Sequence, residues 1–389
     1  MWRNIASNAL SLLVVALFVL GGVILWGQSQ YKSAGPLDQA ICLRVPPGST
    51  MPRVSEDLEA QGAISSGAIF RMGAEYSDKT RQLKAGAFLV PEGASMEEIV
   101  DIVTRGGAST CGTEIIWRVG VRRNLVQVRE LDPATNDLVI IAEFVPGPDG
   151  DEGDAIPAEY ETRRAQADTR LILDVVPGVT SWQVIDGLRS SGFVDGVPDT
   201  VPPEGSLAPR DYEIRRGDTG ADLIARMSEL QSQRLAEAWA NRVDGLPYDS
   251  PQEALIMASI VEKETGLPDE RRQVASVFVN RLRQGMRLQT DPTVIYGVTN
   301  GRGILGRGLR QSELSRETPY NTYIIPGLPP TPIANPSLAA IEATMNPADT
   351  PYIFFVADGS GGHAFAETLA EHNKNVARWR QIESERAQQ

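Results

Sequence analysis

Two carboxylates lie where an apolar segment ends, in the stretch MASIVEKETG over residues 257–266. From Ala254 to Val261 almost every residue is apolar, which predicts a helix that is buried on nearly all sides. The sequence Thr-Gly-Leu-Pro that follows is a stop signal, so Glu262 and Glu264 belong to the last helical turn. A carboxylate there faces the negative end of the helix dipole, which is unfavourable by a few tenths to about 1 kcal/mol.

The two acids point to different sides of this predicted helix, because a spacing of two residues separates their directions by roughly 200°. Glu262 follows a stripe of Leu255, Ala258 and Ser259, whose small members leave room beside it. Partial burial and the helix C-terminus both favour the protonated form of Glu262, which general-acid catalysis on a glycosidic oxygen needs. The helix leaves two interpretations open, catalysis and a salt-bridged structural role.

Polar side chains also mark two proline-containing segments, residues 286–297 and 317–336. Proline stiffens such segments, and Asn, Gln and Tyr suit sugar hydroxyls and amides through hydrogen bonds and ring stacking. The alternative is that both segments are ordered loops packed on a domain core. The candidates for holding a sugar chain are Gln289, Asp291, Tyr320, Asn321 and Tyr323.

The composition excludes several classes of function. A formal net charge of −13 over 389 residues argues against nucleic-acid binding, which calls for a basic surface. His363 and His372 are the two histidines, and no Cys/His cluster has metal-ligand spacing, so we expect neither a metal nor a cofactor. Cys42 and Cys111 flank one compact segment, and the sequence leaves open a disulfide and two buried free thiols.

The N-terminus carries the strongest apolar run, ALSLLVVALFVLGGVILW over residues 9–26. It is long enough to cross a bilayer, and the charges around it favour a cytoplasmic N-terminus at residues 1–8 and an exported body. A cleaved signal peptide is the alternative. Residues 27–40 are predicted to be a linker.

An internal repeat follows the linker. Residues 45–64 align with 175–194, and residues 83–106 align with 204–227. Each copy predicts a strand, a Pro-Gly turn, a Thr-capped helix that ends at Gly, and then a second strand and helix. Such units resemble LysM-type glycan-binding modules; the alternative is duplicated scaffolding without a ligand.

The predicted fold is α+β, with a transmembrane helix, repeated LysM-like α/β modules, a β insertion and a mixed α/β catalytic domain. The alternation of apolar and polar residues predicts strands in the insertion, which also holds an acidic loop at residues 146–166. Helices and a hairpin are expected in the last domain. The predicted domains are 41–111 and 171–229 (modules), 112–170 (insertion) and 230–389 (catalytic domain); the predicted helices are 230–242, 251–264, 269–284, 336–345 and 367–385, with a hairpin over 350–368.

Four stretches occur in the order and spacing of a known family: ASIVEKET, GMRLQTDPTVIYG, YNTYIIPGLPPTPIANP and YIFFVADGSGGHAFAETLAEHN. Over residues 205–385 the chain resembles the endolytic murein transglycosylases, the YceG-like family. Two features depart from the family pattern, because Thr331 stands where the family usually has Gly and the 112–170 insertion has no counterpart.

The resemblance implies a single-pass inner-membrane enzyme with a periplasmic body. Such an enzyme cuts nascent peptidoglycan strands between N-acetylmuramic acid and N-acetylglucosamine, leaves 1,6-anhydro ends and works beside peptidoglycan synthases. Carried over by motif, the first Glu of VEKE, Glu262, is the catalytic acid, and Asp291 assists electrostatically. Two rivals stand beside this prediction: a non-catalytic glycan-binding scaffold, and a hydrolase that uses Glu262, Asp291 and water.

Overall fold

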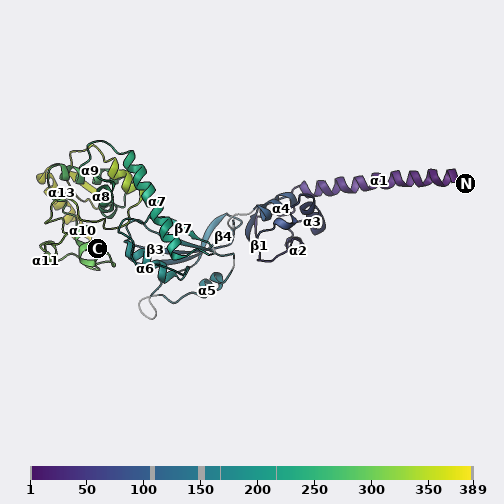
Figure 1. Cartoon of the computed structure of the whole chain (residues 1–389), viewed down its shortest axis with the longest axis horizontal. Coiled ribbons are helices and arrows are strands. Elements are labelled where there is room, and N and C mark those ends of the chain that lie inside the picture. Colours follow the sequence, from purple (N-terminus) through teal and green to yellow (C-terminus); the bar gives the residue numbers. More distant parts are fainter. Residues whose placement is uncertain (1, 106–109, 148–153, 167, 216, 387–389) are drawn as a thin grey trace. The chain divides into compact units, whose positions relative to one another are not determined.

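The computed structural model describes residues 2–105, 110–147, 154–166, 168–215 and 217–386, with side chains from residue 12 onward (Figure 1). Its mixture of helices and strands confirms the predicted α+β class. The elements form two compact units. Unit 1 comprises residues 1–115, 127–143 and 155–170, and unit 2 comprises residues 116–126, 144–154 and 171–389.

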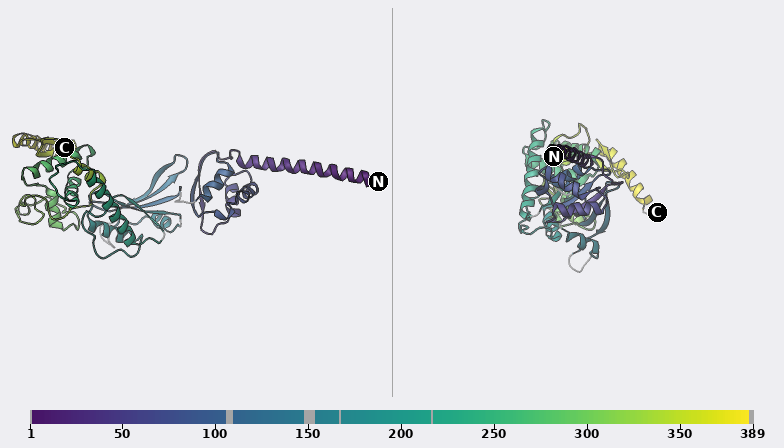
Figure 2. Two further views of the ribbon diagram at one scale, coloured as in Figure 1. Left: turned by 45° about the horizontal axis from the view of Figure 1, so that its top comes forward. Right: turned by 90° about the vertical axis from the view of Figure 1, so that its right-hand side faces the viewer.

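The apolar N-terminal run belongs to one continuous helix, α1 (Trp2–Lys32), seen from two sides in Figure 2. Its segment Leu12–Lys32 is long and apolar enough to cross a membrane, and the side chains of its most apolar part are not buried. The helix extends six residues into the predicted linker. Tyr31 explains this extension, because its ring is buried in the core of unit 1 and holds the last turn in place.

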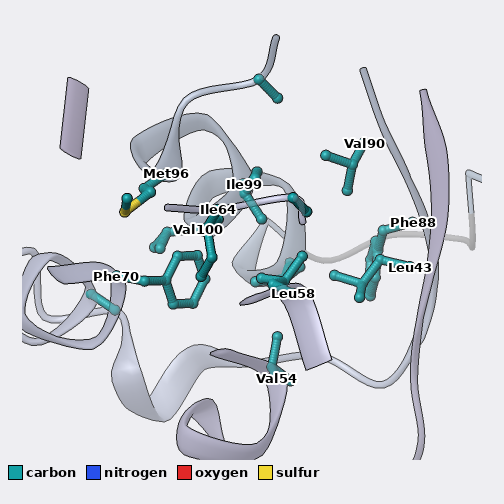
Figure 3. Close-up of a cluster of buried hydrophobic side chains, with 14 of the residues drawn as sticks. Leu43, Val54, Leu58, Ile64, Phe70, Phe88, Val90, Met96, Ile99 and Val100 are labelled. Carbon is teal, nitrogen blue, oxygen red and sulfur yellow. The ribbon is translucent and has the colours of Figure 1, made fainter. Parts of the chain in front are cut away.

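Unit 1 is organised around a small apolar core. The side chains of Leu58, Phe70 and Ile99 are fully buried and meet there (Figure 3). A disulfide joins Cys42 to Cys111, so the bridge is the alternative that the structure adopts. The elements around the core are β1 (Ile41–Val45), α2 (Met51–Ala60), α3 (Gly67–Tyr76), η1 (Thr80–Gln82), β2 (Gly86–Val90) and α4 (Met96–Thr104), with β1 and β2 antiparallel.

A five-stranded sheet has the order β5-β4-β3-β6-β7. Three of its strands lie in the segment for which the sequence predicts β-structure. Part of the predicted acidic loop, residues 148–153, lies outside the described residues, and a later part of it forms a short helix. These elements are β3 (Thr113–Val119), β4 (Leu125–Asp132), β5 (Asp137–Phe144), α5 (Ala158–Arg164), β6 (Arg170–Val175) and β7 (Asp211–Ile214).

The second copy of the repeat is a strand–helix–strand–helix unit of β6, α6 (Ser181–Ser191), β7 and α7 (Gly220–Ala240). It pairs its two strands antiparallel, as the first copy does, but lacks a counterpart of α3. Helix α7 also runs through the predicted domain boundary at residue 229. No Gly or Pro interrupts the helix between residues 221 and 240, so the final helix of the repeat and the first predicted catalytic helix form one element.

The rest of unit 2 surrounds one central helix, α8, whose residues 254–261 are all buried. Helix α8 contacts α7, α9, α10 and α12, which explains why it is apolar on every side. Its bounds match the predicted 251–264. The elements are α8 (Pro251–Glu264), η2 (Pro268–Glu270), α9 (Arg271–Arg283), α10 (Asp291–Thr299), α11 (Gln311–Leu314), α12 (Leu338–Met345), β8 (Phe354–Ala357), β9 (His363–Ala366) and α13 (Leu369–Arg386).

Candidate active site

Helix α8 holds its last turn rigidly. Ser250 caps the N-terminus by accepting a hydrogen bond from the backbone of Glu253, and Pro251 follows in the first turn, where its missing N–H is not needed. Thr265 ends the helix in an extended conformation. The acids Glu262 and Glu264 therefore start from a fixed backbone, and both are half-buried.

Glu262 is bound to the start of another helix. Its Oε2 accepts a hydrogen bond of 2.9 Å from the backbone N–H of Ser337 and a second one from the Ser337 hydroxyl. Ser337 is itself the N-cap of α12 and accepts from the backbone of Ala340. The positive end of the α12 dipole therefore faces this carboxylate and offsets its position at the negative end of α8.

Lys263, between the two acids, contacts the second repeat. Its Nζ donates a hydrogen bond of 3.1 Å to the backbone carbonyl of Gly178, in the Pro-Gly turn of the second repeat. Burial lowers the pKa of Lys263, while the nearby charges of Glu262 and Glu204 act to raise it. The ammonium thus connects the end of α8 to the repeat.

Glu264 has different surroundings. Burial raises the pKa of Glu264, and the charge of Asp291 raises it further. The hydroxyl of Thr290 donates a hydrogen bond to Oε1 of Glu264, which acts to lower this pKa, as do the charges of His363 and Arg281. Burial is the largest of these effects, so Glu264 keeps its proton to higher pH than an ordinary glutamate does.

Asp291 and Tyr323 form a pair beside Glu264. The Tyr323 hydroxyl donates a hydrogen bond of 2.7 Å to Oδ1 of Asp291, which is the first residue of α10. Burial raises the pKa of Tyr323, so its hydroxyl stays protonated and remains a donor. Gln289 lies two residues before Asp291, is exposed, and has a φ of 51°, a conformation that residues other than Gly adopt rarely.

The remaining predicted sugar contacts face the interior. Asn321 is fully buried, and its side-chain amide donates to the carbonyls of Glu313, Leu314 and Arg316. Its oxygen accepts from the backbone N–H of Tyr323, so the side chain has no donor left for a sugar. These contacts favour the alternative for Asn321, that of an ordered loop.

Tyr320 is half-buried against Tyr296, with ring centroids 5.0 Å apart. Its hydroxyl shares a hydrogen bond of 2.8 Å with the hydroxyl of Thr331. Thr331 is the residue at which the sequence departs from the family pattern, and here it anchors the tyrosine. This arrangement also favours a packing role.

One polar pair near Glu264 escaped the sequence-based prediction. The backbone N–H and the ring Nδ1 of His363 each lie 2.8 Å from a different carboxylate oxygen of Glu270. Gly362 allows this approach, because a Cβ at that position would lie 2.5 Å from Oε1 of Glu270. The signal for this pair was Gly362, directly before His363 in the stretch GGHAF. The glycines of this stretch predicted only a hairpin turn.

Among the residues that the structure describes, no cluster of three or more His, Cys, Asp or Glu side chains offers a metal site. The arrangement around Glu264 can donate a proton and take it back. The arrangement around Glu262 joins the end of α8 to the start of α12.

Comparisons with known proteins place this geometry in a family context. The model of the YceG-like family matches residues 43–378. An endolytic murein transglycosylase from Bacillus subtilis (strain 168) is 26% identical over 92% of this chain and 89% of its own length. One from Streptococcus pneumoniae serotype 2 is 27% identical over 96% of this chain, which spans 65% of that relative.

One solved structure is also similar. A crystal structure of a YceG-like protein from Listeria monocytogenes has a TM-score of 0.46 and 23% identity, over 86% of this chain and 98% of that one. The family model, by contrast, covers most of the 389 residues, including both acids at the end of α8. The chain belongs to the YceG-like family.

Proposed function

We propose that this protein is an endolytic murein transglycosylase that cuts peptidoglycan glycan strands between N-acetylmuramic acid and N-acetylglucosamine. The observation that carries the proposal is a half-buried carboxyl group, Glu264, with a raised pKa beside the Asp291–Tyr323 pair. The relatives from Bacillus and Streptococcus, which bear this name, support the substrate class.

The surroundings favour Glu264 over Glu262 as the proton donor. A general acid must hold a proton near neutral pH and give it to the substrate. Burial and the charge of Asp291 keep the proton on Glu264. Glu262 accepts two hydrogen bonds from Ser337, and both occupy its Oε2. The motif-based choice of Glu262 remains the alternative, and matched variants of the two acids decide between them.

The reaction needs one carboxyl group that acts twice. Glu264 gives its proton to the oxygen that joins C1 of N-acetylmuramic acid to the next sugar, and the C1–O bond breaks with oxocarbenium character at C1. The resulting carboxylate takes the proton from the muramoyl C6 hydroxyl while O6 bonds to C1. The products are a 1,6-anhydro end and a free hydroxyl, Glu264 is again protonated, and no water is consumed.

Asp291 has an electrostatic part in this scheme. Its carboxylate carries negative charge beside the reacting centre, where positive charge develops in the transition state. The Tyr323 hydroxyl holds Oδ1 of Asp291, which fixes the orientation of the carboxylate. The exposed side chain of Gln289, next to Thr290, is placed to contact a sugar. Gln289, Asp291 and Tyr323 thus remain proposed substrate contacts.

The N-terminal helix supports a proposal for location. Helix α1 serves as a single-pass anchor in the inner membrane, with a cytoplasmic N-terminus and a periplasmic body. An anchored enzyme meets strands as they are made, so cleavage would terminate their elongation near the synthases. The βααβ unit of residues 41–90 serves as a LysM-like glycan contact in this proposal.

One experiment tests the function. The full chain in detergent is incubated with uncrosslinked glycan strands, and mass spectrometry identifies the product ends. We expect internal cleavage with 1,6-anhydro ends. Reducing ends would instead support a hydrolase that directs water with Asp291, and strand binding without cleavage would support a glycan-binding scaffold.

A further inference from the structure

A cavity of about 560 Å³ in unit 2 runs along helix α10, and its lining includes Lys263, the residue between Glu262 and Glu264. Pro292, Ile295, Tyr296 and Thr299 line it, and their spacing of three and four residues places them on one face of the helix. This face is about 10 Å long, since each helical residue rises about 1.5 Å. Two lining residues, Pro292 and Lys263, are chain neighbours of Asp291 and Glu264, so the cavity lies beside the proposed active site.

The walls of the cavity are largely apolar. Besides the face of α10, the lining includes Val121, Ile333 and the loop residues Ile304 and Leu305. Ile304 is 54% exposed, so its aliphatic surface is accessible to a ligand. Such a surface suits methyl and methylene groups better than the hydroxyl-covered edge of a sugar ring.

The charges that line the cavity are all positive. Lys263, Arg122 and Arg307 belong to the lining, and none of the described residues that line it is Asp or Glu. This contrasts with the chain as a whole, whose net charge is −13. Arg307 is paired with Glu313, so Lys263 and the exposed Arg122 are the cations available to a ligand.

Lys263 lines the cavity and can donate hydrogen bonds to a ligand in it. Its ammonium group donates one hydrogen bond to the carbonyl of Gly178, and a lysine ammonium has three donors. The wall beside it is preorganised, because Gln183 accepts from the backbone of Thr180 and donates to the carbonyl of Val121. The cavity therefore combines apolar walls with two cationic groups, the ammonium of Lys263, which is fixed by its bond to Gly178, and the exposed guanidinium of Arg122.

We propose that this cavity binds the peptide that murein carries on the lactyl group of N-acetylmuramic acid. The lactyl and alanyl methyl groups contact the apolar walls, and a peptide carboxylate faces Arg122 and Lys263. The proposal rests on the proposed function, because it assumes a muramoyl residue next to Glu264. It makes the enzyme selective for strands that still carry peptides.

The test compares two substrates and two neighbouring arginines in the full-length protein in detergent. Glycan strands are prepared with their peptides and, after amidase treatment, without them. For Arg122→Glu we expect kcat/KM to fall about tenfold on peptide-bearing strands, because a charge-assisted contact becomes a repulsion, and to stay unchanged on bare strands. Arg123→Glu is the matched control: Arg123 is equally exposed but does not line the cavity, and this variant should cleave both substrates normally.

A binding measurement keeps this proposal separate from the proposed function. Calorimetry with N-acetylmuramoyl-L-alanyl-D-isoglutamine should detect binding to the unaltered protein, and weaker binding to Arg122→Glu. If no strand is cleaved but this pattern of binding holds, the transglycosylase proposal fails and the peptide site stands. An equal loss on both substrates in Arg122→Glu, or equal binding by both proteins, would overturn the peptide site.

Discussion

The last turn of α8 carries a glutamate on each of two sides, and the surroundings of the two carboxyl groups are opposite in kind. Glu262 faces the N-terminus of α12, where a backbone N–H and a hydroxyl bind its carboxylate. Glu264 faces Thr290 and Asp291, where burial and a like charge oppose its ionisation. Both acids share the unfavourable dipole of α8. The difference teaches that contacts from distant segments, and not the position in its own helix, set the surroundings of each acid.

The largest expected effect on the cleavage rate comes from replacing each of the two acids, one at a time, with glutamine. Glu264→Gln should lower the cleavage rate about 10²- to 10⁴-fold, because it removes the general acid and base while keeping the shape of the side chain. The measurement is the release of new strand ends per unit time, by mass spectrometry of purified full-length protein.

Glu262→Gln is the matched control for that change. The amide keeps one oxygen that can accept from Ser337, so folding and most of the activity should persist. If Glu262→Gln loses activity while Glu264→Gln keeps it, the comparison is reversed, and the motif-based choice of Glu262 is the correct one.

The pH dependence of cleavage comes next in size. Glu264 must be protonated to act, so activity falls as the pH rises through its raised pKa. Asp291→Asn removes a charge that raises this pKa, so the falling limb of the pH–rate profile should move to lower pH.

Tyr323→Phe serves as the control for Asp291→Asn. It removes the hydrogen bond to Asp291 but keeps the carboxylate charge, so the limb should not move to lower pH as it does in Asp291→Asn. A profile of Asp291→Asn that coincides with that of the unaltered protein would contradict the electrostatic coupling between the two acids.

A smaller effect is expected on the other side of the turn. Ser337→Ala removes the N-cap of α12 and one hydrogen bond to Glu262, and should lower the free energy of unfolding by about 1 kcal/mol. Ser250→Ala removes the cap of α8 and should cost a similar amount without touching Glu262. Urea titration measures both losses. Cleavage by the two variants should be alike, and a selective loss of activity in Ser337→Ala would give Glu262 a part in catalysis.

The smallest effect on cleavage should come from unit 1. Replacing Cys42 and Cys111 with Ser opens a bridge that closes a chain segment of 69 residues, which should destabilise unit 1 by about 2–5 kcal/mol. The acids lie in unit 2, so the folded variant should cleave soluble strands at the normal rate. Thermal unfolding and a cleavage assay below the transition separate the two effects.

Local features of the sequence predicted α8 well. The Ser-Pro start, the continuous apolar run and the Thr-Gly stop determine its bounds, because capping and burial on all sides act within the segment itself. The same reasoning placed two acids in one turn and separated their directions. It could not decide which of the two acids is the proton donor, because their partners come from distant parts of the sequence. Ser337 lies 75 residues from Glu262, and Thr290 lies 26 residues from Glu264.

The repeats show the same limit. Thr50 and Thr180 occupy equivalent positions and precede helices of similar pattern, yet Thr50 makes no side-chain cap while Thr180 forms a capping box with Gln183. Thr180 also donates to the carbonyl of Gly301, 121 residues away. Equivalent local sequences therefore end in different contacts, and in the second copy the loop that follows α10 supplies one of them.

By itself the sequence determined the apolar N-terminal helix, the strand and helix order of the second repeat, the bounds of α8 and the family motifs. These follow from propensity, capping and periodicity, which act over a few residues. The tertiary structure alone decided which acid lies against Asp291 and which lies against α12. It also decided that the side chain of Asn321 makes its hydrogen bonds within its own loop. Those outcomes depend on burial and on charges brought together from distant segments, and the free energy of a proton on a carboxylate responds to both.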